Sequence, residues 1–252
     1  MVRLGQNFLA DPNLLDAIVR DAELRGDEVV LEVGAGEGVL SERLADAVAR
    51  LHVVEIDRRL EGALTDLVAR PNVSLHWGDA MQFDLAGLDP APTAVVANLP
   101  YAVATPLILR TIEQLPTLER WTVMVQREIA DRLRAEPGSK TYGAPSVLTQ
   151  LACEVRLLRT VDPAVFRPRP RVESAILTLR RIGPAADAET WALVRAAFAH
   201  RRKALARSVD LVRPGSLATV RAALTKLGLP ESARAEQLSP DEFRALGEGL
   251  SR

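Results

Sequence analysis

The stretch Val29-Val30-Leu31-Glu32-Val33-Gly34-Ala35-Gly36-Glu37-Gly38 decides the fold class of this 252-residue chain. An apolar run with β-type residues stops at glycines in alternate positions, and a helical pattern follows over residues 39–44. Strand, glycine-rich turn and helix in this order form the nucleotide-binding corner of an α/β sheet. Because glycine has no side chain, the main chain can turn tightly there and approach a ligand.

The glycine spacing favours a nucleoside cofactor other than NAD. A dinucleotide fingerprint, G-x-G-x-x-G, needs a third glycine where this chain has Val39, and the pattern here is E-x-G-x-G-x-G. Glu55 ends the next apolar run, where a carboxylate can accept both hydroxyl hydrogens of a ribose. Asp79 follows the third run and can accept from an adenine amino group. Taken singly, these residues also fit a packing turn, a surface ion pair and a helix cap. In this order they predict S-adenosylmethionine, held at Gly34, Gly36, Glu55 and Asp79.

Apolar runs alternate with helical patterns through the first half of the chain. This alternation predicts a doubly wound, mostly parallel, Rossmann-like sheet. Two later β-like runs, 154–161 and 172–179, flank the proline-rich Phe166-Arg167-Pro168-Arg169-Pro170 and can pair as a closing hairpin. The strands of the first half are expected at 29–33, 51–56, 73–76, 94–97 and 121–125.

A linker at residues 183–187 separates this α/β region from a purely helical one. Helical patterns follow at 191–198, 217–227 and 240–246, with no further strand signal. We therefore expect an α/β domain over residues 1–182 and a small helical domain over residues 183–252.

Composition restricts the class of protein. With 48% hydrophobic residues, the chain can bury a large core. A single cysteine, Cys153, predicts neither an internal disulfide nor a metal site, and we expect it to be a small buried residue. Apolar runs fall short of the roughly 20 residues that span a bilayer, and no signal-peptide pattern is present, so we expect a cytoplasmic protein.

The net charge of −1 is unusual for a protein that binds nucleic acid, because phosphate affinity normally requires a basic surface. A near-neutral net charge can still include a basic surface, because arginines gather in two clusters in the second half of the chain. A solvated surface is the alternative explanation for either cluster. The clusters are Arg167, Arg169, Arg171, Arg180 and Arg181, and Arg195, Arg201, Arg202, Lys203 and Arg207.

Asn98-Leu99-Pro100-Tyr101 predicts where a target amine binds. Asn98 ends an apolar run, so its carboxamide should emerge at the edge that carries the glycines. Pro100 keeps Leu99 out of the α conformation, which lets carbonyls of the loop point outward. The two hydrogens of an aminopurine N6 group can then bond to Asn98 Oδ1 and a loop carbonyl, while the base stacks on Tyr101. An isolated turn with a buried tyrosine is the alternative.

With these residues, the chain resembles the ribosomal RNA adenine N6-dimethyltransferase family, in particular its bacterial small-subunit branch. The resemblance runs nearly end to end. Besides the motifs above, it rests on Leu4-Gly5-Gln6-Asn7-Phe8-Leu9, Gln126-Arg127-Glu128-Ile129-Ala130, Tyr142-Gly143 with Ser146-Val147, the segment from Val165 to Ala175, and Ala197-Phe198-Ala199-His200-Arg201-Arg202-Lys203.

The resemblance implies transfer of two methyl groups from S-adenosylmethionine to N6 of two adjacent adenosines in a small-subunit (16S) rRNA hairpin loop. We expect a monomer that acts on a pre-ribosomal particle, without a membrane or a metal, with the methyltransferase domain at residues 1–182 and the RNA-facing helical domain at residues 183–252. The resemblance places Asn98, Pro100, Tyr101 and a stacking Phe166 at the target base, and Asn7, Leu9, Gly34, Glu55, Asp79 and Asn98 at the cofactor; the basic RNA-contacting residues are expected to be Arg167, Arg169, Arg171, Arg201, Arg202 and Lys203.

Some residues depart from the family pattern, and other functions stay open. Ala102-Val103 replaces a usual Asn-Ile after the loop, and Pro145 replaces a usual leucine, which bears on rate and on completion of the second methylation. The alternatives are a large-subunit (23S) resistance methyltransferase and an rRNA-binding assembly factor with weak or lost catalysis. An NAD oxidoreductase is a remote third, disfavoured by Val39.

Overall fold

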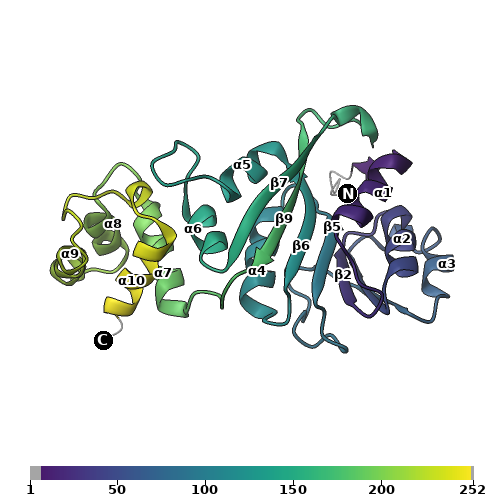
Figure 1. Cartoon of the computed structure of the whole chain (residues 1–252), viewed down its shortest axis with the longest axis horizontal. Coiled ribbons are helices and arrows are strands. Elements are labelled where there is room, and N and C mark those ends of the chain that lie inside the picture. Colours follow the sequence, from purple (N-terminus) through teal and green to yellow (C-terminus); the bar gives the residue numbers. More distant parts are fainter. Residues whose placement is uncertain (1–6, 251–252) are drawn as a thin grey trace. The chain divides into compact units, whose positions relative to one another are not determined.

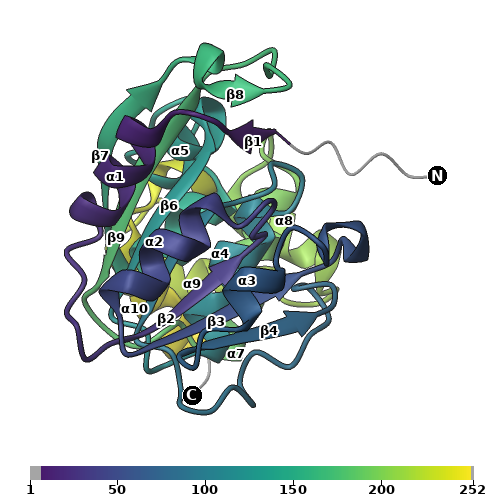
Figure 2. The same cartoon turned by 90° about the vertical axis from the view of Figure 1, so that its right-hand side faces the viewer.

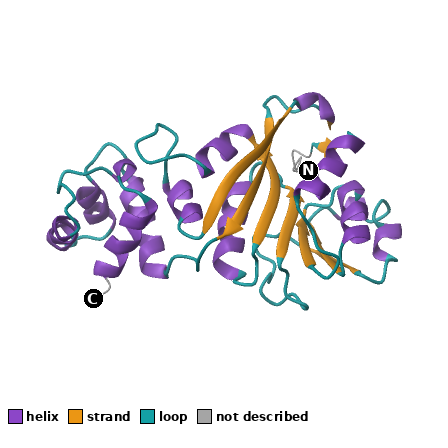
Figure 3. Cartoon of the chain, viewed as in Figure 1, coloured by secondary structure: helices purple, strands orange, loops and turns teal. Residues whose placement is uncertain are grey.

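The computed structural model describes residues 7–250, which form two compact units (Figures 1 and 3). Unit 1 contains the chain up to Ala130 together with Val155–Arg181, and unit 2 contains Asp131–Glu154 together with the chain from Ile182 onward. The second cut lies one residue from the predicted boundary at 182. The structure differs in also assigning 131–154 to the unit with the C-terminal helices.

A mixed sheet organises the α/β part. Within the described residues, seven strands pair in the order β4-β3-β2-β5-β6-β9-β7, with β2 to β6 parallel and β9 antiparallel to β6. The predicted doubly wound class is confirmed, and the two late strands are neighbours, as the hairpin prediction requires. The strands are β2 (Val29–Val33), β3 (Arg50–Glu55), β4 (Val73–Trp77), β5 (Ala94–Asn98), β6 (Arg120–Gln126), β7 (Cys153–Val161) and β9 (Ser174–Arg181).

Helices cover both faces of the sheet because its central strands are apolar on both sides. Val30, Val53 and Val96 belong to one core cluster with Leu15 of α1 and Leu44 of α2. On the opposite face, the Trp121 indole donates to the Thr111 hydroxyl of α4 at 2.9 Å. Figure 2 shows α1, α2 and α3 in front of the strands. These helices are α1 (Pro12–Asp21), α2 (Val39–Ala47), α3 (Thr65–Val68), α4 (Ala104–Gln114) and α5 (Arg127–Leu133), with a 3-10 turn at Arg58–Leu60.

A second, two-stranded sheet joins the N-terminal motif to the proline-rich segment. β1 (Phe8–Leu9) pairs antiparallel with β8 (Phe166–Arg167), which follows a 3-10 turn at Pro163–Val165. Ala10 N also donates to Val165 O at 2.9 Å. Figure 2 shows β1 and β8 close together. The segment predicted to be an extended loop therefore contributes a strand.

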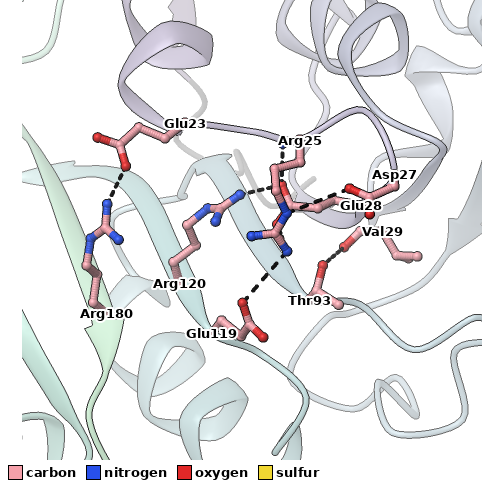
Figure 4. A network of polar contacts seen from close by, with 9 residues as sticks. All are labelled: Glu23, Arg25, Asp27, Glu28, Val29, Thr93, Glu119, Arg120 and Arg180. Atoms are coloured by element: carbon pink, nitrogen blue, oxygen red, sulfur yellow. Dashed lines mark hydrogen bonds and ion pairs between the residues drawn. The ribbon is translucent and has the colours of Figure 1, made fainter.

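A buried ion pair closes the edge of the sheet where the parallel strands begin (Figure 4). Glu28 precedes β2 and Arg120 begins β6, and their side chains are 2% and 10% exposed. Arg25 adds a main-chain N–H bond of 2.6 Å and a guanidinium contact of 3.2 Å to the Glu28 carboxylate. Because this network holds the opposite ends of the strands from those that carry the predicted ligand residues, it is structural.

Unit 2 is helical and has its own aromatic core. The ring centroids of Tyr142 and Phe198 lie 6.0 Å apart, and those of Phe198 and Phe243 lie 5.8 Å apart. The Tyr142 hydroxyl donates to Leu238 O at 2.9 Å, which explains why the segment around α6 groups with the C-terminal helices. The helices are α6 (Ala144–Gln150), α7 (Ala188–Ala199), α8 (Leu205–Val212), α9 (Leu217–Lys226) and α10 (Pro240–Leu250), with a 3-10 turn at Ala235–Gln237.

Two smaller predictions have a structural outcome. Cys153 is free and buried, as expected. Among residues 7–250, no helix combines the length and the apolar character needed to cross a membrane.

Candidate functional site

One cavity of about 270 Å³ lies where β2, β3, β4 and β5 end. The carboxyl edge of parallel strands is where α/β sheets bind ligands. Nine of the residues predicted to bind ligand line this cavity, namely Asn7, Leu9, Gly34, Gly36, Glu55, Asp79, Asn98, Pro100 and Tyr101. Sequence positions that lie far apart therefore converge on a single site within unit 1.

The glycine turn lies against the Asn98 loop. Gly34 and Gly36 have φ angles of 82° and 58°, which side chains other than glycine rarely tolerate. A Cβ atom on Gly34 would lie 3.5 Å from Pro100 Cδ, so the turn and the loop touch. A Cβ on Gly36 would lie 3.0 Å from Phe8 Cδ1. Both glycines are therefore required by their backbone conformation, and Gly36 is required also by its close packing against Phe8.

Glu55 is held rigidly at the end of β3. Its Oε1 accepts from the main-chain N–H groups of Ile56 and Asp57 at 2.9 and 2.8 Å, and its Oε2 accepts from Gly36 N at 3.0 Å. Oε1 already accepts two bonds, so the remaining acceptor capacity is the second lone pair of Oε2. The geometry thus connects Glu55 to the glycine turn and leaves Oε2 able to accept from a ligand hydroxyl.

Asp79 has two functions in the structure. Its Oδ1 accepts from Met81 N at 2.9 Å and Oδ2 lies 3.4 Å from Gln82 Nε2, so it caps the turn after β4. It also lines the cavity. The cap predicted as an alternative is present, and it leaves acceptor capacity on the side that faces the cavity.

Glu32 is a cavity residue that the sequence interpretation did not single out. Its side chain is 1% exposed, and Oε2 has no hydrogen-bond partner among the described residues. Burial raises its pKa to about 8; the neighbouring Ser41 hydroxyl opposes the rise and the charge of Glu55 adds to it. The signal was in the sequence, because Glu32 is a carboxylate inside an otherwise apolar strand.

The Asn98 carboxamide points to the cavity and not into the core. Its Nδ2 donates to the main-chain carbonyl of Asn7 at 3.4 Å, which leaves Oδ1 as an acceptor. Leu99 N donates to Met124 O at 3.0 Å and Val103 N to Pro100 O at 3.1 Å, so the loop is fixed at both ends. Asn98 is therefore in the place that the predicted amine site requires.

The N-terminal residues of the family motif also border the cavity. Asn7, Phe8 and Leu9 line it, and Leu9 is 6% exposed. The preceding motif residues Leu4, Gly5 and Gln6 lie outside the described residues. β1 therefore forms one wall of the predicted cofactor site.

Phe166 is placed differently from the prediction. It is 2% exposed and belongs to the core cluster that includes Leu9 and Leu15, and it does not line the cavity. The pairing of Phe166 with Leu9 in the β1–β8 ladder turns the ring inward. In this structure Phe166 supports β1 and does not present a face to a base.

The arginine clusters divide into exposed and structural members. Arg167, Arg171, Arg202 and Lys203 are exposed and form no ion pair within residues 7–250, while Arg169 lies 3.6 Å from Asp162. Other members are structural: Arg180 pairs with Glu23, Arg181 donates to Leu118 O at 2.6 Å, and Arg201 donates to Tyr142 O at 2.8 Å. Arg201, expected to contact RNA, instead binds carbonyls of the loop before α6.

Comparison with known proteins identifies the family. The model of the family described as ribosomal RNA adenine dimethylase matches residues 2–249. The chain belongs to this family. A ribosomal RNA small subunit methyltransferase A of Rubrobacter xylanophilus is 45% identical over 99% of this chain and 94% of its own length. The protein of the same name from Streptomyces coelicolor is 46% identical over 97% of this chain and 88% of its own.

Solved structures show the same fold. A dimethyladenosine transferase from Plasmodium falciparum superposes with a TM-score of 0.79 over 95% of both chains, at 24% identity. The 23S rRNA methyltransferase ErmE superposes with a TM-score of 0.70 over 98% of this chain and 100% of its own, at 30% identity. The resemblance predicted from the motifs is confirmed, and the chain is an S-adenosylmethionine-dependent rRNA methyltransferase of this family. This assignment excludes the NAD oxidoreductase alternative.

Proposed function

We propose that this chain dimethylates N6 of two adjacent adenosines in a hairpin loop of small-subunit rRNA, with S-adenosylmethionine as methyl donor. The observation that carries the proposal is the position of Asn98, whose carboxamide lines the same cavity as the glycine turn and Glu55. A methyl donor and a target amine can therefore meet within one cavity, with an amide acceptor between them.

The residues of the cavity fit S-adenosylmethionine. Glu55 offers its Oε2 to a ribose hydroxyl, and Asp79 offers an acceptor to the adenine amine. Glu32 is a buried carboxyl without a partner on Oε2, which a cationic ligand would compensate. When bound, the cofactor supplies a methyl group on a cationic sulfonium. Asn7 and Leu9 of the β1 wall complete the proposed binding set.

Catalysis by this chain then consists mainly of positioning. Asn98 Oδ1 and a loop carbonyl accept the two hydrogens of the amine and direct its lone pair, and the ring of Tyr101 receives the flat face of the base. No strong base is required, because the methylated ammonium loses its extra proton to solvent. The Tyr101 phenol is not a base here, since burial raises its pKa above the ordinary value while the Ser174 hydrogen bond lowers it less strongly.

A single-stranded target agrees with this geometry. A-form duplexes hide base edges, and an enzyme that acts on N6 takes the base out of its stack. The exposed cations suited to RNA phosphates are Arg167 of β8, Arg171 after it, and Arg202 and Lys203 in unit 2. We further propose that the protein works as a monomer on a pre-ribosomal particle in the cytoplasm, where this substrate is assembled.

A large-subunit target is the second candidate. The likeness to the 23S rRNA methyltransferase ErmE covers the whole chain, so the fold is compatible with that substrate. The identities of 45% and 46% to small-subunit methyltransferases favour the first candidate. An assembly factor without catalysis is disfavoured because Asn98, Tyr101 and Glu55 are all present at the cavity.

Labelled S-adenosylmethionine and under-methylated ribosomal subunits test the proposal. We expect label in the small subunit and N6,N6-dimethyladenosine in its digest. We expect Asn98→Ala to lose this product while its affinity for S-adenosylmethionine, measured by calorimetry, stays within about fivefold, because a neutral amide hydrogen bond contributes only about 1 kcal/mol to binding. Label in the large subunit would support the second candidate, and full activity of Asn98→Ala would overturn the mechanism.

A further inference from the structure

A hydrogen bond that the proposed mechanism does not use joins the Asn98 loop to the sheet. The Tyr101 hydroxyl lies 2.6 Å from the Ser174 hydroxyl. Tyr101 is partly exposed and lines the cavity, whereas Ser174 is fully buried at 0% exposure. A buried serine thus anchors the polar end of a cavity-lining ring.

The direction of β9 explains why Ser174 lies at the functional edge. β9 runs antiparallel to β6, so its first residue lies beside the last residue of β6, and Ser174 is paired with Gln126. Arg127 N donates to Glu173 O at 3.0 Å and continues this ladder by one step. In the same sheet, Asn98 is paired with Met124. Ser174 and Asn98 are therefore fixed relative to each other by main-chain pairing through β6.

The ring of Tyr101 has two rotatable bonds, and an anchor at its far end fixes both. Phe166 is buried elsewhere and offers no opposing face, so the hydrogen bond to Ser174 is a main restraint on the plane of the Tyr101 ring. Stacking requires a defined ring plane, and small misplacements of a bound substrate slow a positioned reaction strongly. The anchor consequently matters for the reaction and not for the cofactor, which the glycine turn, Glu55 and Asp79 would hold.

We propose that Ser174 is a positioning residue for methyl transfer, whose hydroxyl holds the Tyr101 ring in the plane that receives the target base. This inference rests on the proposed function. Ser174 touches neither ligand; it acts through Tyr101 alone. It belongs to the Val172-Glu173-Ser174-Ala175 segment of the family resemblance, to which no function was assigned.

A double-mutant cycle tests this dependence, with single-turnover methylation of under-methylated subunits as the readout. We expect Ser174→Ala and Tyr101→Phe each to slow the methyl-transfer step about tenfold, because each removes the same anchor. The double variant should be no slower than either single variant. Calorimetric affinity for S-adenosylmethionine should be unchanged in all three.

Controls separate this inference from folding and from the proposed function. Thr178→Ala removes another hydroxyl from the same strand, away from the site, and should leave the rate unchanged. Thermal melting identifies variants that fail to fold, in which case Tyr101→Phe alone carries the test. If Ser174→Ala slows the reaction equally in the wild-type and Tyr101→Phe backgrounds, or has no effect in an active enzyme, the inference is overturned. An inactive wild-type protein would instead overturn the proposed function.

Discussion

At the scale of single residues, the charge inside the cavity depends on pH through the buried carboxyl group of Glu32. The strand that positions the glycine turn buries this side chain completely, and the charged form loses its hydration there. A neutral carboxyl at physiological pH follows, since its pKa of about 8 lies above 7. A cationic ligand in the cavity would favour the charged carboxylate and lower this pKa.

Glu32→Gln should change the pH dependence of stability. The folded pKa of about 8 exceeds the ordinary value of 4.5, so the stability that neutral Glu32 gives is complete below pH 4.5 and is lost as pH rises towards 8. Glutamine is neutral throughout. The difference between the free energies of unfolding of the variant and the wild type should therefore rise in favour of the variant, by at most about 1.4 kcal/mol per pH unit across this window. Urea unfolding at pH 5, 6, 7 and 8 measures it, and parallel curves would contradict the assignment.

The site was predictable where a residue ends a strand and not where packing decides. Gly34, Glu55, Asp79 and Asn98 all follow apolar runs, and the topology of a parallel sheet brings such ends together. Phe166 could not be placed in this way, because its burial depends on the pairing of β8 with β1. The assigned roles of these residues in binding and catalysis stay predictions.

At the scale of elements, the pair of Glu28 and Arg120 shows how the ends of β2 and β6 are joined. Breaking one partner of a buried ion pair costs about 3 to 5 kcal/mol because the other charge stays buried, whereas replacing both partners by apolar residues is often neutral. Arg25 still compensates Glu28 when Arg120 is removed, while Arg120 has no other acceptor within residues 7–250.

We therefore expect Glu28→Leu to lower the free energy of unfolding more than Arg120→Leu, and the double variant to be more stable than Glu28→Leu alone. Urea unfolding followed by circular dichroism gives the three values. Methylation per folded molecule should stay at the wild-type level, because the pair lies at the edge away from the cavity. A double variant whose loss equals the sum of the single losses would show that the two side chains act independently.

Helices and strands with local signals were predicted closely, and those that depend on distant partners were not. The helix predicted over residues 39–44 is present as α2 (Val39–Ala47) and begins directly after the glycine turn. α8 was missed because its N-cap, Ala204, forms no side-chain cap. β1 and β8 have two residues each, too few for a periodic pattern, and exist through their mutual pairing.

At the scale of the whole molecule, a net charge of −1 is compatible with RNA binding because many arginines are used within the protein. Arg180 pairs with the carboxylate of Glu23, and Arg201 donates to the main-chain carbonyl of Tyr142, so both side chains have partners within the fold. The exposed remainder, including Arg202 and Lys203, is smaller than the sequence clusters indicate. The salt dependence of RNA binding should therefore be moderate.

Neighbouring residues in unit 2 allow a test of which cations bind RNA and which stabilise the fold. Arg202→Ala/Lys203→Ala removes two exposed cations, and we expect the slope of log K for subunit binding against log salt to decrease in magnitude by about 1 to 2, with little change in melting temperature. Arg201→Ala is the matched control: it removes the same charge type but frees the carbonyls of Tyr142 and Lys140, so it should lower the melting temperature of the protein. Filter binding at several salt concentrations and thermal melting measure the two effects. An unchanged slope in the double variant, or a stability loss as large as that of Arg201→Ala, would mean that these cations serve the fold and that the RNA is held elsewhere.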